Sequence, residues 1–209
     1  MILYEDNDII VCHKSAGIAV QSARIGEKDL VSMLNNHLAE QAGGKHPESV
    51  RVVHRLDQPV EGIVVFAKNK KAAASLSAQI TDGSMKKVYQ AVCCVTEAGG
   101  HWIGKTDSCK QRQVSSFKTE QSEKEPDGNA GKNDQELIDY MAKDARTNSS
   151  AVVKKGQKDA KEARLSFRVM AANCLPYVLV EIHLATGRHH QIRVQMAHAG
   201  LPLFGDRKI

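Results

Sequence analysis

The segment RVVHRLDQPVEGIVVFAK, residues 51–68, places charged side chains directly before a short apolar run. The run from Gly62 to Ala67 is continuous and β-branched, a composition typical of a strand buried on both faces. Gln58-Pro59 predicts a turn, because proline cannot continue a central strand and fixes its own φ. We therefore expect Asp57 where a strand gives way to a loop, and its carboxylate either caps the turn or takes part in chemistry.

The residues just before this turn combine a histidine, an arginine and a carboxylate. In an extended strand His54 and Leu56 would lie on one face, and Arg55 and Asp57 on the other. An arginine and a carboxylate would then leave the strand toward the same opening. A surface ion pair with an Asx turn is the plain alternative, and this segment alone does not decide between the two.

Composition is that of an ordinary globular protein, with 209 residues, 42% of them hydrophobic and 25% charged. This length allows one large domain or two small ones. No stretch reaches the roughly 18–20 apolar residues of a membrane span. The start, MILYEDNDII, carries acids where a signal peptide needs a basic region. Five scattered cysteines without a C-x-x-C pair argue against disulfides and structural zinc. We therefore expect a cytoplasmic protein without a membrane anchor.

Charge is distributed unevenly along the chain. Residues 163–209 carry six Lys/Arg against two acids, together with four histidines. Such a region suits a polyanionic partner such as nucleic acid, although a solvated basic face explains the charge equally well. Residues 118–139 carry three lysines against seven acids. Alanine is the only hydrophobic residue type in 118–136, which predicts a flexible acidic insertion or surface loop.

Hydrophobic periodicity and turn residues outline the order of elements. Strands are predicted over residues 9–11, 62–67, 86–95, 164–171 and 177–185, and helices over 29–42, 68–80, 137–145 and 189–199. Residues 173–176 would join the last two strands as a hairpin. The last helix would turn Ile192, Met196 and Ala199 inward and end at Gly200. Arg188 would then lie in a strand-to-helix turn, among backbone N–H groups that suit anions.

Motifs for metal binding, phosphate binding and a serine nucleophile are absent from the sequence. His189 and His190 are adjacent and have no histidine partner at i+4, which disfavours a metal site. Neither a Gly-rich phosphate loop nor a G-x-S-x-G nucleophile elbow occurs. The residues by themselves indicate a mixed α/β protein with a basic C-terminal region and a loop bearing an arginine and an aspartate.

Three segments, taken in order, resemble the signature motifs of the RluA family of RNA pseudouridine synthases. They are HRLDQPVEG (54–62), KVYQA (87–91) and TGRHHQIR (186–193), the last followed by a G-D pair. The opening YEDNDIIVCHKSAG (4–17) also resembles the entry strand and loop of that family, which usually reads K-P-A-G. The resemblance spans nearly the whole chain. It implies the α+β pseudouridine synthase fold, in which helices flank a mixed, largely antiparallel central sheet with an RNA-binding cleft, as a single catalytic domain over residues 1–209.

The resemblance also implies the reaction and the catalytic residues. The family isomerises uridine in RNA by cutting the glycosidic bond, rotating the uracil and rejoining it through C5. Asp57 corresponds to the essential aspartate, which acts as a nucleophile or otherwise enables the base to detach. Arg188 matches the arginine that pairs with it, and Tyr89 the tyrosine that stacks on the target base. No metal or organic cofactor is expected, because nothing is oxidised and no group is carried away.

RNA contacts follow from the same resemblance. A uridine inside folded RNA must be flipped out before it can react. Arg55 matches the residue that takes its vacated place, and a planar guanidinium can stack and contact phosphate together. His54, His189 and Arg193 are expected to face the RNA as well. We expect a monomer that acts on ribosomal or transfer RNA.

Departures from the family pattern keep other functions open. Val60-Glu61-Gly62 stands where the family commonly has T-S-G, and we expect Glu61 to face outward. Family members usually continue past the G-D pair, whereas this chain stops at Ile209 and is either naturally short or truncated. One alternative is an RNA-binding protein or RNA chaperone that retains the fold without catalysis. Another is a hydrolase that uses Asp57 and Glu61 as a carboxylate pair.

Overall fold

The computed structural model describes residues 1–22, 26–43, 48–103 and 134–206. It divides the chain into two compact units, Met1–Met85 and Lys86–Ile209, and each is described by itself. Residues 118–133 of the predicted insertion lie outside the described residues, as does Arg207. Among the helices of the described ranges, none is long and apolar enough to cross a membrane.

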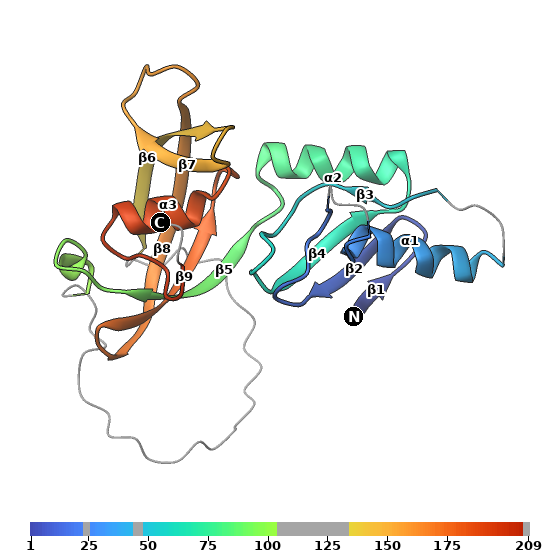
Figure 1. Cartoon of the computed structure of the whole chain (residues 1–209), viewed down its shortest axis with the longest axis horizontal. Coiled ribbons are helices and arrows are strands. Elements are labelled where there is room, and N and C mark those ends of the chain that lie inside the picture. Colours follow the sequence, from blue (N-terminus) through green and yellow to red (C-terminus); the bar gives the residue numbers. More distant parts are fainter. Residues whose placement is uncertain (23–25, 44–47, 104–133, 207–209) are drawn as a thin grey trace, which may run out of the picture. The chain divides into compact units, whose positions relative to one another are not determined.

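The first unit is built on a four-stranded sheet whose paired strands are all antiparallel. Its strands follow the spatial order β1 (Ile2–Glu5), β2 (Ile9–Lys14), β4 (Gly62–Ala67) and β3 (Arg51–Val52) (Figure 1). Two helices complete the unit, α1 (Leu30–Gln41) and α2 (Lys70–Asp82). The strand predicted over 62–67 is confirmed, and both helices lie within two residues of their predicted ends.

The core of the first unit joins β2 and β4 to one face of α1. Every second residue of the strands and every fourth residue of the helix contributes to this core, because side chains repeat on one face every 2 residues in a strand and about every 3.6 residues in a helix. Its buried members include Ile10, Cys12, Val64, Phe66, Leu30, Leu34 and Leu38. Ile63 corrects one expectation, since it is 59% exposed and β4 is therefore not buried on both faces. The period of two turns Ile63 away from the core, to a side where little covers it.

The second unit contains a five-stranded sheet, again with antiparallel pairs throughout. The spatial order is β5 (Val88–Cys94), β9 (Tyr177–Leu184), β8 (Lys161–Cys174), β6 (Gln135–Asp144) and β7 (Ser149–Val153). A 3-10 turn, Gly100–Trp102, follows β5, and α3 (Gln191–His198) follows β9. Its core includes Leu165, Phe167, Val180, Ile182 and Met196, so α3 packs on the sheet through Met196. The predicted hairpin between β8 and β9 is confirmed.

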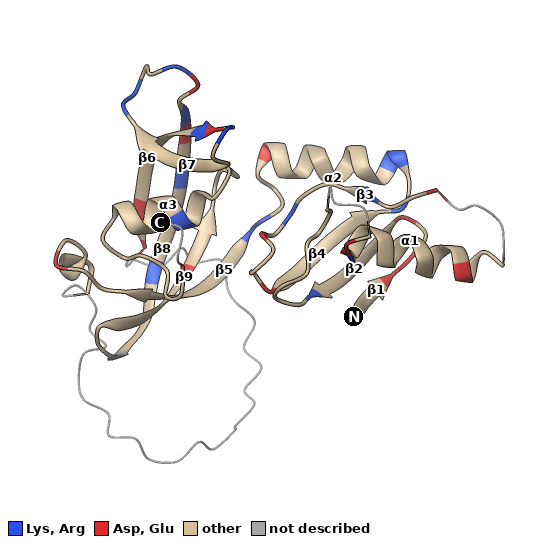
Figure 2. Ribbon diagram, in the orientation of Figure 1, with Lys and Arg blue, Asp and Glu red and all other residues tan. Residues whose placement is uncertain are grey.

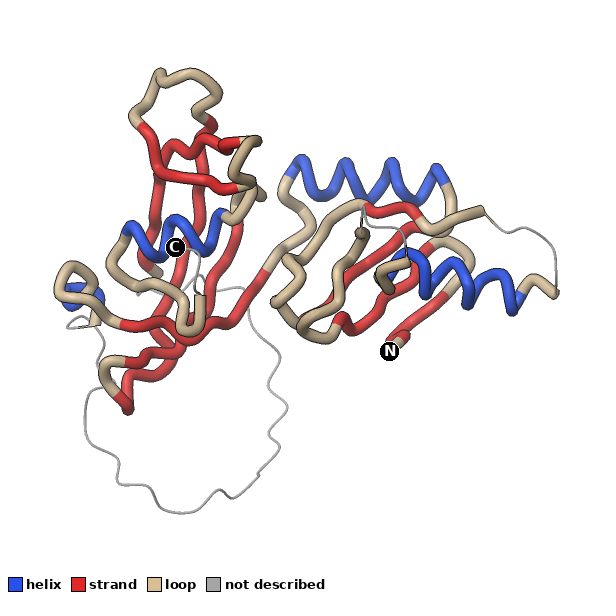
Figure 3. Tube along the Cα trace, in the orientation of Figure 1, coloured by secondary structure: helices blue, strands red, loops and turns tan. Residues whose placement is uncertain are grey.

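The helix predicted over residues 137–145 is wrong, because this segment belongs to β6 (Figure 3). β6 pairs with β8 from Gln135 to Met141 and with β7 from Tyr140 to Asp144. Its composition alone tolerates a helix, but pairing with β8 over its first part and with β7 over its last part overrides that local preference.

Asp29 provides a test of how the first unit is stabilised. Its buried side chain caps α1 by accepting hydrogen bonds from the backbone N–H groups of Ser32 and Ser22, each at 2.7 Å. Burial raises the pKa of Asp29, but these donors outweigh it and hold the pKa below the ordinary 3.8. Stability from the ionised form is therefore present above that value and lost as pH falls through the lower folded pKa.

We expect Asp29→Ala to lower the free energy of unfolding by about 1–2 kcal/mol at pH 7 and by less at pH 3, measured by urea unfolding. Asn69→Ala is the matched control, since Asn69 caps α2 through Ala72 N with a neutral amide. The Asn69 amide also donates to Asp8 Oδ1 at 2.7 Å, and the cost of Asn69→Ala should change with pH by less than that of Asp29→Ala. An equal cost of Asp29→Ala at both pH values would contradict this account of the cap.

Candidate active site

The loop that carries Asp57 is fixed to the segment that follows β2. The N–H of Val60 donates to the carbonyl of Asp57 at 3.0 Å, which closes the predicted turn. The carbonyl of Gln58 accepts from Gly17 N at 2.9 Å and from Lys14 Nζ at 3.0 Å. The Gln58 side chain returns a bond, with Nε2 donating to Gly17 O at 3.0 Å. Four hydrogen bonds thus hold this turn. The sequence predicted the turn but not the residues that bond to it.

Lys14 lies beneath this loop with no exposure to solvent. Its ammonium donates to the carbonyls of Ser15 and Gln58 at 3.2 and 3.0 Å. Burial lowers the pKa of Lys14, while the nearby charges of Asp57 and Glu61 act in the opposite direction. The structure therefore places a buried cation close to the candidate catalytic carboxylate. Sequence reasoning did not single out Lys14, although the KSAG segment that resembles the family's entry loop begins with it.

The backbone between Val52 and Gly62 is a loop, so the expected strand alternation of His54 to Asp57 is wrong. β3 ends at Val52 because its ladder with β4 covers only two residue pairs. His54 is half-buried and its Nε2 accepts the N–H of Val65 at 3.0 Å, which leaves Nδ1 as the protonated nitrogen of the neutral ring. Arg55 is exposed and Asp57 is half-buried. Contacts of His54 and Arg55 with RNA stay predictions.

Glu61 faces outward, as expected. Its side chain is 61% exposed, and its Oε1 lies 3.1 Å from Nε2 of His13 on β2. This gives Glu61 a partner other than Asp57, and the structure offers no support for a hydrolytic pair of these two carboxylates.

In the second unit, Tyr89 and Arg188 come to the same end of the sheet. β5 and β9 are antiparallel, so the start of β5 lies beside the end of β9, where Leu184 N donates to Lys87 O at 3.0 Å. Tyr89 is at the start of β5, and Arg188 follows β9 by a few residues. Lys87 brings a second cation here, since a Cβ added to Gly187 would lie 3.6 Å from its Nζ. Burial lowers the pKa of Lys87.

The turn that bears Arg188 is anchored at two points, while its side chain is exposed. Arg188 Nε donates to the carbonyl of Glu162 on β8 at 2.8 Å. Its backbone N–H donates to Gln191 Oε1, also at 2.8 Å, and the same oxygen accepts from Thr186 Oγ1. The guanidinium is therefore held by a backbone carbonyl of β8, and the backbone of the turn by the first residue of α3.

Two buried glutamines continue this network through α3. Gln191 is 3% exposed and Gln195 not at all, and Gln191 Nε2 donates to Gln195 Oε1 at 3.0 Å. Gln195 Nε2 in turn donates to Asp139 Oδ2 on β6 at 2.9 Å. Sequence analysis placed apolar residues at the inward positions of this helix and missed both glutamines. A series of hydrogen bonds through the two glutamine side chains thus connects the backbone of Arg188 with β6.

The histidines and the second arginine of this segment have partners within the unit. His189 Nδ1 lies 2.8 Å from Ser150 Oγ on β7, and its ring is 3.7 Å from that of His190. Arg193 forms two bonds with Asp206, of 2.6 and 2.7 Å, and both side chains are largely buried. Arg193 therefore ties the segment after α3 to the helix, and its contact with RNA stays a prediction. Within the described residues, no group of three or more His, Cys, Asp or Glu could hold a metal ion.

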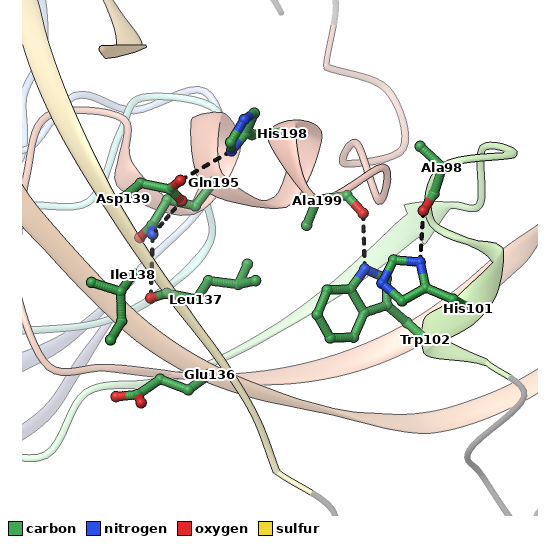
Figure 4. Close-up of a pocket in the computed structure, with 10 residues that line it drawn as sticks. All are labelled: Ala98, His101, Trp102, Glu136, Leu137, Ile138, Asp139, Gln195, His198 and Ala199. Carbon is green, nitrogen blue, oxygen red and sulfur yellow. Dashed lines mark hydrogen bonds and ion pairs between the residues drawn. The ribbon is translucent and has the colours of Figure 1, made fainter. Parts of the chain in front are cut away.

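A pocket of about 380 Å³ lies elsewhere in the second unit, between β6, the end of α3 and the segment after β5 (Figure 4). Asp139 stands in its wall between Gln195 and His198, whose Nδ1 is 3.0 Å from Asp139 Oδ1. On the other side Trp102 Nε1 donates to Ala199 O at 2.9 Å. The pocket contains none of the residues that the sequence predicted, and its polar side chains other than Glu136 bond groups in its own wall.

The predicted catalytic residues thus fall into two sets. Asp57 belongs to the first unit, on a loop held over a buried cation. Tyr89 and Arg188 share one end of the sheet in the second unit, so the structure brings these two together. The pairing of Asp57 with Arg188 stays a prediction. Together the sets supply a positioned carboxylate, an exposed guanidinium and an aromatic ring.

Comparison with known proteins places these residues in a family. A family model described as RNA pseudouridylate synthase matches residues 8–198. The RNA pseudouridine synthase YhcT of Bacillus subtilis is 32% identical over 98% of the chain and 56% of its own length. Ribosomal large subunit pseudouridine synthase D of Pseudomonas aeruginosa is 30% identical over 98% and 52%. The chain therefore spans about half the length of these relatives.

A solved structure supports the fold. Human RNA pseudouridylate synthase domain containing 4 superposes with a TM-score of 0.67 at 20% identity, covering 99% of this chain and 67% of the human one. The α+β fold with antiparallel sheets that the resemblance implied is thereby confirmed.

The glutamine network gives a test of what holds the Arg188 turn. Gln191→Leu would leave the N–H of Arg188 and the hydroxyl of Thr186 without their acceptor. We expect a loss of about 2–4 kcal/mol in the free energy of unfolding, measured by urea titration. Gln90→Leu, the same change at an exposed position of β5, should stay within about 0.5 kcal/mol. Similar effects of the two changes would show that the network does not stabilise the unit.

Proposed function

The chain belongs to the RNA pseudouridylate synthase family, and from this premise we propose that it isomerises uridine to pseudouridine in structured RNA. The proposal rests above all on Asp57, the residue that matches the family's essential aspartate, because its loop is held in one shape by Lys14, Gly17 and Val60. Catalysis depends on such positioning, since a reacting group must be in place before the bond breaks.

Asp57 supplies the carboxylate on which detachment of the uracil depends. The glycosidic bond at N1 breaks, the uracil turns within the site, and a carbon–carbon bond forms from C5 to the same ribose carbon. The proton on C5 leaves and one returns to N1, so substrate and product have the same atoms. Nothing in this sequence of bond changes requires an oxidant or a group carrier.

Arg188 and Tyr89 take complementary roles. The exposed guanidinium of Arg188 pairs with the Asp57 carboxylate. Tyr89 presents a flat ring on which the uracil stacks. Both roles come from the match to the family motifs, and the shared position of the two residues at one end of the β5–β9 pair is consistent with them.

Arg55 serves the step before chemistry. The target uridine has to leave its stack, at a cost of a few kcal/mol. Arg55 is exposed on the same loop as Asp57, so its guanidinium is free to fill the space that the base vacates. We propose that both units act together as one catalytic domain. We also propose that the RNA is ribosomal or transfer RNA, the classes in the names of ribosomal large subunit pseudouridine synthase D and of tRNA pseudouridine synthase C of Vibrio cholerae, two similar proteins.

A pair of substitutions in the Asp57 loop tests the activity. Asp57→Asn keeps the shape of the side chain and removes the carboxylate, so the rate of pseudouridine formation should fall by at least about 1000-fold. The affinity for RNA, measured by filter binding, should change less than threefold (about 0.7 kcal/mol). Glu61→Gln removes an exposed carboxylate four residues away and should retain most of the activity. Equal rates for Asp57→Asn and the wild type would exclude a catalytic role for Asp57.

Site-resolved pseudouridine mapping identifies the substrate. RNA from cells that lack the protein is compared after complementation with the wild type and with Asp57→Asn. A uridine that is modified only with the wild type would establish both the activity and the RNA. Effects on growth or RNA folding that Asp57→Asn restores would instead favour an RNA-binding protein without catalysis.

A further inference from the structure

A dense set of exposed cations lies on β6, β7 and the segments that join them to each other and to β8. These residues form the basic hairpin surface: Lys143, Arg146, Lys154, Lys155, Lys158 and Lys161. Between residues 143 and 161 the only acids are Asp144 and Asp159. In Figure 2 positive segments recur along the loop between β7 and β8 and near the turn between β6 and β7.

The charges of this surface are largely unneutralised. Arg146 lies 4.0 Å from Asp144 in a pair whose arginine is 91% exposed, which contributes little. Lys155 Nζ stands 5.5 Å from the centroid of the Tyr140 ring, a contact that involves no carboxylate. Within the part of the chain that the structure describes, Lys154 and Lys158 have no carboxylate within salt-bridge distance. Repulsion among these cations is relieved most directly by an anionic partner.

The surface is anchored beside the turn that bears Arg188. His189, next to Arg188, lies 2.8 Å from Ser150 on β7, and Arg188 itself donates to Glu162 on β8. The five residues of β7 extend over about 17 Å, with cations beyond both of its ends. A single nucleic-acid strand carries about one phosphate per 3.4 Å of helix axis, so about five phosphates fit along this length.

We propose that the basic hairpin surface binds the phosphate backbone of the substrate RNA beside the nucleotide that reaches Arg188. This inference rests on the proposed function and adds to it where the flanking RNA lies. Lysine ammonium groups contact phosphates as point charges, and this surface has few groups suited to reading bases. Its contribution is therefore affinity that does not depend on sequence. An acidic protein would have no reason to dock beside Arg188, whereas RNA that delivers a uridine there must pass close to it.

The test uses the full chain and a fluorescently labelled RNA stem–loop with uridines in the loop. The variant replaces Lys154, Lys155 and Lys158 with glutamine, all in the exposed loop between β7 and β8. Each lost phosphate contact should reduce the slope of log Kd against log salt by about 0.7–0.9, so a reduction of about 2 is expected. Affinity at 0.1 M salt should fall at least about tenfold, because fewer counterions are released.

The matched control replaces Lys28, Lys70 and Lys71 with glutamine, which removes the same charge from exposed positions in the first unit. It should reduce the slope by less than about 1. Equal reductions in the two variants would overturn the proposal, since they would show only a general effect of net charge. An unchanged slope in the loop variant would overturn it too and would leave the surface available to an acidic protein.

Pseudouridine formation in the RNA identified by mapping separates this inference from the proposed function. Half-maximal pseudouridine formation by the loop variant should require at least about tenfold more RNA than with the wild type, because the three lysines act in binding. In one outcome the wild type forms no pseudouridine, while the loop variant, unlike the control variant, loses RNA affinity. That result would support the binding surface and contradict the proposed function. If pseudouridine forms and the loop variant binds RNA with the same salt-dependent affinity as the wild type, only the inference about the surface fails.

Discussion

A lysine ammonium withdrawn from water is costly unless its protons find acceptors and its charge finds carboxylates nearby. Lys14 meets both conditions in the first unit, with two backbone carbonyls as acceptors and the charges of Asp57 and Glu61 close by. Through these bonds it joins the end of β2 to the turn that follows Asp57. The shape of the Asp57 loop therefore depends on a group that never contacts solvent.

In the second unit, neutral buried side chains hold the Arg188 turn in place. Gln191 and Gln195 replace apolar residues at buried positions of α3 and bond in series from the Arg188 turn to β6. In both units a candidate catalytic side chain that is exposed or half-buried is carried by backbone whose polar groups are hydrogen-bonded inside the unit. These candidate side chains are thus separate from most of the interactions that position them.

Sequence patterning predicted the elements whose local and tertiary preferences agree. The apolar run of β4 and the leucines of α1 have one stable arrangement each, and their bounds were correct within a residue or two. Residues 137–145 failed because pairing with β7 and β8 decides their conformation. Gln191 and Gln195 were missed because polar residues at inward positions break the pattern on which core prediction relies. For the site, the roles came from motif resemblance, and residues 54–57 proved to be a loop rather than a strand.

The acceptors that Lys14 uses belong to the main chain, and this has a consequence for sequence drift. Every residue presents a carbonyl, so replacing Ser15 leaves the bond from the ammonium intact. Side chains around the Asp57 loop are therefore able to vary while its path is preserved. Serine at position 15 and glutamate at position 61, where the motifs that this sequence resembles usually have proline and serine, leave these main-chain acceptors in place.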